Sequence, residues 1–180
     1  MIRAIKIGFF VLFLSIIFVN YSYAEMAKEG KISGTNFYSG SHEIIPLDKE
    51  HFVMSYENFG VRVSDSKTGP FHGMSSHNIG VFYFENGVGK LRGYVINTDK
   101  DGDKIIMEIN EDATQMAPKP SKGKGKILEG TGKFKGIQGG IEYIRQNMYP
   151  AEKGTHQAIS KFTGTYKIVQ EWKWIAYKGI

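Results

Sequence analysis

Residues 75–112, SSHNIGVFYFENGVGKLRGYVINTDKDGDKIIMEINED, decide the fold of this chain. The stretch holds two turn dipeptides, Asn86-Gly87 and Asp101-Gly102, each between strand-like runs. Both dipeptides tolerate the positive φ angles of a two-residue type I′ hairpin. The stretch therefore predicts three consecutive antiparallel strands, and the turns set their register.

The predicted register names the side chains that face one another. If Glu85 and Val88 flank the first turn, the facing pairs are Phe82–Leu91, Gly80–Gly93, Asn78–Val95 and Ser76–Asn97. If Lys100 and Asp103 flank the second turn, Glu108 lies beside Val95 and Ile106 beside Asn97. The glycine pair is expected to allow local bending of the sheet.

Side chains alternate along a strand, so these positions share one face. One half of this face is apolar, and the other half is polar with the carboxylate of Glu108. A buried carboxylate is costly unless it is hydrogen-bonded or protonated, and Asn78 and Asn97 can donate to it. We therefore predict an interior small-molecule site made of Ser76, Asn78, Phe82, Val95, Asn97 and Glu108. The alternatives are that Glu108 lies in water at the rim, or that a bulge turns the face over.

The sequence pattern predicts strands along the whole chain and no long helix. Eight strand-like segments cover residues 31–47, 51–63, 75–85, 88–98, 104–110, 123–130, 139–148 and 155–168. We predict an all-β fold, an eight-stranded antiparallel up-and-down barrel over residues 25–168. We prefer the barrel to a sandwich because closure removes the edge strands and eight strands can enclose one small ligand. The 22 glycines fit such strong coiling.

Residues 1–24 are expected to be a cleaved secretory signal peptide, so the protein should be exported to the periplasm or secreted. They combine a basic start, an apolar stretch and the small-x-small pattern Ser22-Tyr23-Ala24. An uncleaved anchor is the alternative, but the apolar stretch is shorter than the roughly 20 residues of a membrane span. No stable membrane insertion is expected after cleavage near Ala24.

Composition narrows the classes of function further. Cleavage would remove two basic residues and lower the net charge from +5 to +3. A charge this small does not indicate a nucleic-acid partner. The chain has no cysteine, which excludes disulfides, a thiol nucleophile and a cysteine zinc site. About 150 mature residues suit one hydrophobic core.

Several motifs have plain structural explanations, and we expect no cofactor or metal. Asp99, Asp101 and Asp103 alternate like a calcium loop, but Gly102 precedes the third acidic residue, which favours a hairpin turn. His72 and His77 are five apart and lack an evident third metal ligand. Lysines 119, 122, 124 and 126 are expected to be a solvated edge. For the tail, residues 169–180 with Trp172 and Trp174, we expect either a contact within an oligomer or a weakly ordered segment.

Residues 130–139, GTGKFKGIQG, resemble the Gly-Thr-Gly-x-Phe-x-Gly-x-x-Gly stretch of allene oxide cyclase and dirigent-like barrels. The mature chain also looks like a group of exported bacterial proteins with that barrel. Phe134 is expected to plug one barrel end where glycines permit the bend. The resemblance implies a central cavity and frequent oligomers. In the plant relatives this cavity binds a fatty-acid-derived epoxide or guides phenolic radical coupling, with Glu and Asn among apolar walls.

Three functions are consistent with these observations. The leading one is noncatalytic binding of a small, largely apolar molecule, because no catalytic signature is evident. The second is an isomerase or cyclase in which Glu108 acts as acid, base or electrostatic stabiliser while Asn78 and Asn97 orient the substrate. The third is a homo-oligomeric structural or interaction module that uses the Tyr94 face and the tail.

Overall fold

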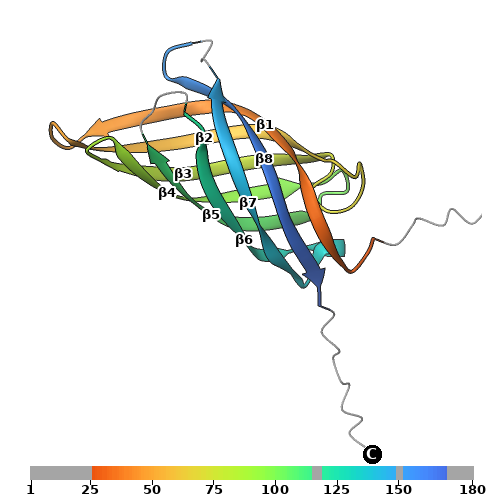
Figure 1. Ribbon diagram of the computed structural model, residues 1–180. Helices are drawn as coiled ribbons and strands as arrows, with labels where there is room; N and C mark the ends of the chain where they lie inside the picture. The colour runs from red at the N-terminus through yellow and green to blue at the C-terminus, as the bar shows by residue number, and fades with distance from the viewer. Residues whose placement is uncertain (1–25, 115–118, 149–151, 170–180) are drawn as a thin grey trace, which may run out of the picture.

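Eight consecutive antiparallel strands close into one barrel, in the order β1 to β8 (Figure 1). This computed structural model describes residues 26–114, 119–148 and 152–169. The strands are β1 (Glu29–Pro46), β2 (His51–Ser64), β3 (Met74–Glu85), β4 (Val88–Thr98), β5 (Lys104–Thr114), β6 (Ser121–Gly130), β7 (Ile137–Met148) and β8 (Thr155–Ile168). The predicted fold class is confirmed. The predicted signal peptide and both tail tryptophans lie outside the described residues.

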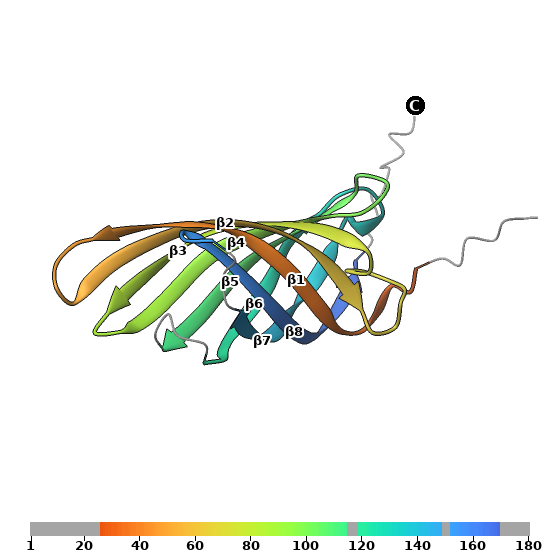
Figure 2. The ribbon, with the colours of Figure 1, turned by 90° about the horizontal axis from the view of Figure 1, so that it is seen from above.

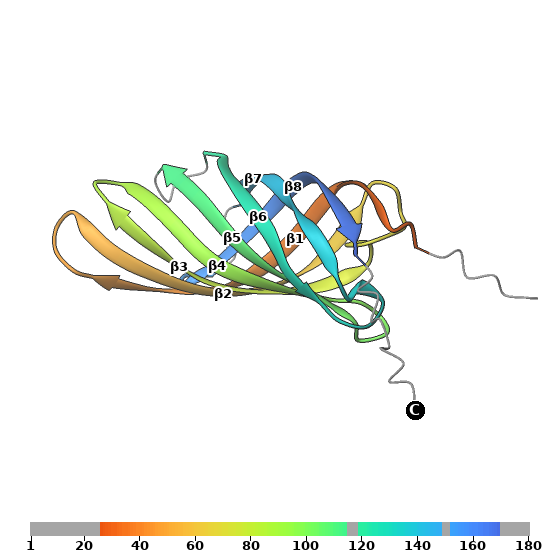
Figure 3. The same cartoon turned by 90° about the horizontal axis from the view of Figure 1, so that it is seen from below.

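The barrel has two unlike ends. The β1–β2 and β3–β4 hairpins reach furthest at one end, here called the hairpin end (Figures 2 and 3). The described chain begins and finishes at the opposite end, here called the terminal end, together with the β2–β3, β4–β5 and β6–β7 connections (Figures 1 and 3). In the part of the chain that the structure describes, no helix is long and apolar enough to cross a membrane.

The first hairpin has the predicted geometry. Asn86 and Gly87 have φ angles of 49° and 77°, as a type I′ turn requires. Glu85 pairs with Val88, and the predicted partners follow in step as far as Ser76 and Asn97. Phe82, Phe84, Leu91 and Val95 are all buried inside the barrel. This part of the predicted register is confirmed.

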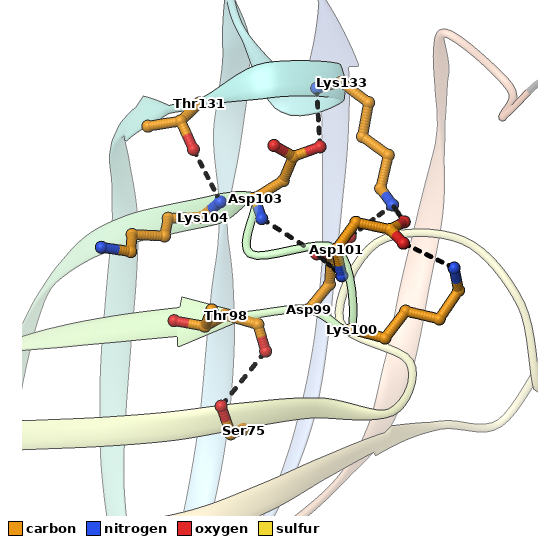
Figure 4. Close-up of polar contacts among 9 residues, drawn as sticks. All are labelled: Ser75, Thr98, Asp99, Lys100, Asp101, Asp103, Lys104, Thr131 and Lys133. Carbon is orange, nitrogen blue, oxygen red and sulfur yellow. Dashed lines mark hydrogen bonds and ion pairs between the residues drawn. The ribbon is translucent and has the colours of Figure 1, made fainter.

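The second hairpin differs from the prediction by one residue. Its loop contains three residues, 100–102, with Gly102 at φ 86°, so it is a turn followed by a glycine bulge. Oδ1 of Asp99 accepts hydrogen bonds from the backbone N–H groups of Asp101 and Asp103, at 2.9 and 3.0 Å (Figure 4). Nζ of Lys133 pairs with Asp99 and, at 2.6 Å, with Oδ2 of Asp101. The loop is thereby tied to the β6–β7 connection.

The shift turns β5 over relative to the prediction, because moving a strand by one residue exchanges its two faces. Val95 pairs with Met107, and Glu108 pairs with Tyr94. Glu108 lies on the outer face, where its Oε1 accepts a hydrogen bond from Nε of Arg92 at 2.8 Å. The prediction that Glu108 and Ile106 face the interior is wrong.

Aromatic side chains fill the terminal end. Phe71, in the β2–β3 loop, adopts a φ of 69° and is fully buried. Phe134 ends a short 3-10 helix, η1 (Gly132–Phe134), and is also buried. Gly136 has a φ of 81°, and a Cβ there would lie 2.2 Å from the carbonyl oxygen of Val169, so the bend requires glycine. The predicted plug by Phe134 is confirmed.

The outside of the barrel carries many exposed apolar side chains. Over β1 to β4 they form what we call the outer apolar face, made of Phe37, Phe59, Val61, Ile79, Val81 and Tyr94. Phe37 pairs with Val61 and Ile79 with Tyr94 across neighbouring strands, so the exposed groups adjoin. Contiguous exposed apolar surface of this kind marks interaction sites in soluble proteins.

Candidate functional site

The barrel encloses a cavity of about 220 Å³. Its lining reaches Met148 and Thr155 beside the β7–β8 connection, whereas Phe71 and Phe134 close the other end. Access from solvent is therefore through the hairpin end.

One wall of the cavity is apolar. It is formed by Phe82 and Phe84 on β3, Leu91 and Val95 on β4, and Ile109 on β5. The rings of Phe82 and Phe84 stack with centroids 5.5 Å apart. This wall presents no hydrogen-bonding side chain, so it suits the hydrocarbon part of a ligand.

Glycines create room for large side chains inside the barrel. Gly80 and Gly93 pair between β3 and β4, and Cβ atoms there would lie 2.8 and 2.9 Å from the hydroxyl oxygen of Tyr56. Gly123 pairs with Tyr143, and its Cβ would lie 2.2 Å from Cζ of that ring. Glycine and lysine thus alternate along β6, so that the glycines leave space for large side chains inside the barrel and the lysines place charge on the outside.

Polar side chains from β8, β1 and β2 form a polar wall that faces the apolar wall, and Asn78 on β3 adjoins the apolar wall, because Asn78 pairs with Val95. Tyr38 and Ser160 share a hydrogen bond between their hydroxyl oxygens at 3.2 Å. Nδ2 of Asn78 donates to Oδ1 of Asn58. Nδ2 of Asn58 also lies 3.4 Å from Nε2 of His156. These groups are paired with one another along the wall while they also line the cavity.

His156 is uncharged at neutral pH. Burial, together with electrostatic repulsion from the nearby His42 and Arg145, lowers its pKa to about 4. The neutral ring offers one donor and one acceptor nitrogen to the cavity.

A buried ion pair stands near the hairpin end. Glu111 accepts two hydrogen bonds from Nε of Arg145, at 3.0 and 3.1 Å, and a further one from Nη2. Oε1 of Glu111 also accepts from Oγ of Ser121 at 2.7 Å, and the Glu111 side chain is 1% exposed. Burial opposes charge on Arg145, but the hydrogen bonds and charge of Glu111 outweigh it and raise the pKa of Arg145. Arg145 therefore stays charged and is held by the Glu111 carboxylate.

Three tyrosine hydroxyls serve as neutral donors. Burial raises the pKa of Tyr38 to about 12. Burial, followed by electrostatic repulsion, also raises the pKa values of Tyr56 and Tyr143. Among the described residues, the buried hydroxyl of Tyr143 forms no hydrogen bond of good geometry, although the nearby Glu111 carboxylate contributes to its raised pKa. It can donate to a molecule in the cavity that brings an acceptor.

A second charge lies deeper, toward the terminal end. Arg62 on β2 is 4% exposed and lines the cavity. Its Cζ lies 5.1 Å from the ring centroids of both Phe71 and Phe162, and its Nη1 contacts Sδ of Met107 at 3.8 Å. Burial lowers the pKa of Arg62 to about 10, so it stays charged at neutral pH. Nε of Arg62 has no partner, and no carboxylate of the described residues forms an ion pair with it.

The contacts of Arg62 compensate its burial only in part. A cation over an aromatic face gains about 0.5–2 kcal/mol. Removing an ion from water costs several kcal/mol even after the protein relaxes. Glu111 does not make up the difference, because Arg145 already binds its carboxylate. The arginines and the glutamate among the described residues that line the cavity therefore leave one positive charge without a counter-charge.

The predicted site residues fall into three groups. Asn78, Phe82 and Val95 line the cavity. Ser76 and Asn97 are buried but do not line it: Ser76 donates to Oδ1 of Asn36 at 3.2 Å, and Nδ2 of Asn97 donates to the Ile105 carbonyl at 3.1 Å. Glu108 is on the outside, so the acid–base role predicted for it has no access to the cavity. Ligand binding by the other five stays a prediction.

Neither histidine that the sequence analysis considered as a metal ligand lines the cavity. His77 lies outside, 2.7 Å from Oε1 of Glu57, with its ring stacked on Phe59 at 4.4 Å. Within residues 26–114, 119–148 and 152–169, no three His, Asp or Glu side chains gather in a way that would hold a metal ion.

The polar centre of the cavity was missed at the sequence level. Arg62, Glu111 and Arg145 are all interior. One available signal was the alternation Ile141, Tyr143, Arg145 along β7, which places an arginine on the same face as two large side chains. The facing glycines of β6 were a second signal, because they make space for that face.

The fold and the cavity define a class of protein: a closed eight-stranded barrel with a small central cavity that is part apolar and part polar. No protein-family model matches the sequence, and comparison with curated proteins finds no match either. Among solved structures, the pterocarpan synthase dirigent protein GePTS1 is similar at 14% identity and TM-score 0.50, covering 78% of this chain and 92% of that one. The pterocarpan synthase dirigent protein PsPTS1 is 13% identical, with TM-score 0.45, covering 81% and 98%. At this identity the likeness to GePTS1 shows the fold alone, a dirigent-like barrel.

Proposed function

We propose that this protein binds a small, largely apolar molecule inside the barrel. The observation that carries the proposal is the cavity of about 220 Å³ inside the barrel, open at the hairpin end, whose lining is mainly apolar on β3 to β5 and mainly hydrogen-bonding on β8, β1 and β2. A packed barrel without a ligand role would fill this space with side chains.

The cavity limits the size of the ligand. An apolar protein cavity of about 150 Å³ accepts benzene. A cavity of about 220 Å³ therefore suits one substituted ring or an aliphatic chain of similar bulk. The rings of Phe82 and Phe84 give such a ring a stacking surface.

The polar wall adds selectivity. Asn58, Asn78 and the neutral His156 ring can orient an oxygen of the ligand. Tyr143 adds a hydroxyl donor that has no partner among the described residues. A plain hydrocarbon would leave the Tyr143 hydroxyl without an acceptor, so the ligand should carry at least one oxygen.

Equilibrium binding of neutral single-ring compounds tests the proposal. Isothermal titration with phenol, benzyl alcohol and benzamide should give saturable 1:1 binding. For seven to nine non-hydrogen atoms at roughly −0.5 kcal/mol each, the Kd should be about 0.5–3 mM.

Two variants locate the binding. Val95 lines the cavity and Val81 lies on the outer apolar face, so Val95→Phe and Val81→Phe add the same atoms inside and outside. Val95→Phe should weaken binding by about tenfold or more, because the added ring fills the cavity. Val81→Phe should leave binding unchanged. Absence of saturable binding for every compound, in a folded wild-type protein, would refute the function.

We further propose that the mature protein acts outside the cytoplasm, starting at Glu25 after cleavage behind Ala24. The support is the pattern of residues 1–24, a basic start followed by an apolar stretch and a small-x-small site. N-terminal sequencing of protein expressed with its own leader should begin at Glu25. An intact leader on cell-associated protein would contradict export.

A further inference from the structure

Arg62 adds a positive charge to the cavity, and binding of a neutral ligand does not account for that charge. It lines the cavity from β2 at the end that Phe71 closes, so its charge lies far from the hairpin end. The nearest cross-strand neighbours of Arg62 are Asn36 on β1 and Met74 on β3, and neither carries a charge. Among the described residues that line the cavity, guanidinium groups therefore outnumber carboxylates by one, because Glu111 is bound to Arg145.

Donor groups surround the same space. The hydroxyls of Tyr143 and Tyr38 belong to side chains that line the same cavity as Arg62. The Tyr143 hydroxyl and Nε of Arg62 are both buried donors without partners in the described chain. A cation together with unpaired donors, in a space with hydrocarbon on its other side, is complementary to an anion that carries an apolar body.

We propose that the ligand of the barrel is a small apolar carboxylate whose carboxylate group pairs with Arg62. This inference rests on the proposed binding function and adds the charge of the ligand to it. The hydrocarbon part lies against Phe82, Leu91 and Val95, and the carboxylate points toward the terminal end. Binding supplies the counter-charge that the barrel itself lacks.

A pair of probes that differ in charge but hardly in shape tests the inference. Benzoate and benzamide have the same ring and the same planar substituent, and both fit the size of the cavity. In wild-type protein at neutral pH, benzoate should bind about tenfold more tightly than benzamide, because hydrogen bonds to a charged group are the stronger ones. This comparison needs no variant.

Two arginine variants assign the preference to a residue. Arg62→Met keeps a long apolar side chain and removes the charge. It should weaken benzoate binding by about tenfold or more and leave benzamide within about threefold. Arg92→Met removes an arginine from the outer face, where Arg92 pairs with Glu108, and should change neither affinity. Thermal unfolding confirms that each variant is folded.

The outcomes separate the two proposals. Equal affinities of wild-type protein for benzoate and benzamide, or benzoate binding that survives Arg62→Met, would overturn the carboxylate inference and leave the binding function standing. If neither probe nor any neutral single-ring compound binds, the binding function fails and the inference fails with it. If Arg62→Met does not fold, the wild-type preference between benzoate and benzamide decides.

Discussion

Replacing Glu111 by glutamine should cost far more stability than the same replacement at Glu108. The Glu111 side chain is 1% exposed and holds both Arg145 and Ser121, so Glu111→Gln leaves a mostly buried guanidinium without a counter-charge. Breaking a buried ion pair on one side costs about 3–5 kcal/mol. The Arg145 side chain keeps 16% exposure, which places the expected loss near the lower value, about 3 kcal/mol.

Glu108→Gln is the matched control. Glu108 pairs with Arg92 on the outer face, where the Arg92 side chain is 73% exposed. Exposed ion pairs contribute about 0–1 kcal/mol, so this variant should be nearly neutral. The two substitutions are chemically identical and three residues apart on β5, so their difference reports which face each carboxylate occupies.

Urea unfolding and thermal unfolding, both followed by circular dichroism, measure the free energy of unfolding and the Tm of both variants. A loss of about 3 kcal/mol should lower the Tm of Glu111→Gln by about 6–12 °C for a domain of this size. The double variant Glu111→Gln with Arg145→Met should recover part of the loss, because it removes the unpaired charge. A change below about 1 kcal/mol for Glu111→Gln, or a larger loss for Glu108→Gln, would refute the register of β5 on which the cavity depends.

Three further variants address the space, the pH response and the outer surface. Gly123→Val should lose about 1–3 kcal/mol of unfolding free energy, because a Cβ there would lie 2.2 Å from the Tyr143 ring. Lys124→Val, on the outer face, should change the unfolding free energy very little. Equal losses for the two variants would contradict the packing of Tyr143 against Gly123. Because burial holds the pKa of His156 at about 4, against about 6.5 when unfolded, the unfolded chain binds the extra proton. Stability should thus be complete above pH 6.5 and fall between pH 6.5 and 4, and His156→Gln should reduce this slope; identical pH profiles would argue against burial of the ring. Phe59 is 57% exposed on the outer apolar face, so we expect this face to be covered by a second copy of the chain. Light scattering should then give a multiple of the monomer mass, and Phe59→Lys should lower that mass. A monomeric wild type would exclude self-association.

The fold could be predicted from the sequence because local signals agree along the chain. Asn86-Gly87 allows few turn geometries, and its type I′ turn fixes the pairing of β3 with β4 as far as Ser76 and Asn97. The sequence 130–139 likewise predicted both the glycine bend and the buried Phe134.

The second turn shows where local signals end. Asp101-Gly102 is compatible with a two-residue loop and with a three-residue loop that ends in a glycine bulge. The choice depends on the Asp99 carboxylate, which caps the loop, and on Lys133, which reaches it from a distant connection. Neither contact follows from the dipeptide, and the one-residue difference exchanged the faces of Glu108 and Glu111.

The cavity was predictable only where the register was anchored. Asn78, Phe82 and Val95 follow from the first turn and do line the cavity. Arg62 lies on β2, which is joined to β3 by the irregular loop 65–73, so no turn signal sets which of its side chains face inward. The inward direction of Arg145 likewise follows from the pairing of β6 with β7, and no turn signal in the sequence sets that pairing.

A crystal structure of the protein grown with 4-bromobenzoate tests the central claim most directly, because the anomalous signal of bromine locates the ligand independently of the fit of its ring. Binding inside the barrel predicts one strong anomalous peak enclosed by Phe82, Leu91 and Val95, with the carboxylate directed to Arg62. Bromine only on the outer surface, with the interior empty or filled by moved side chains, would contradict it.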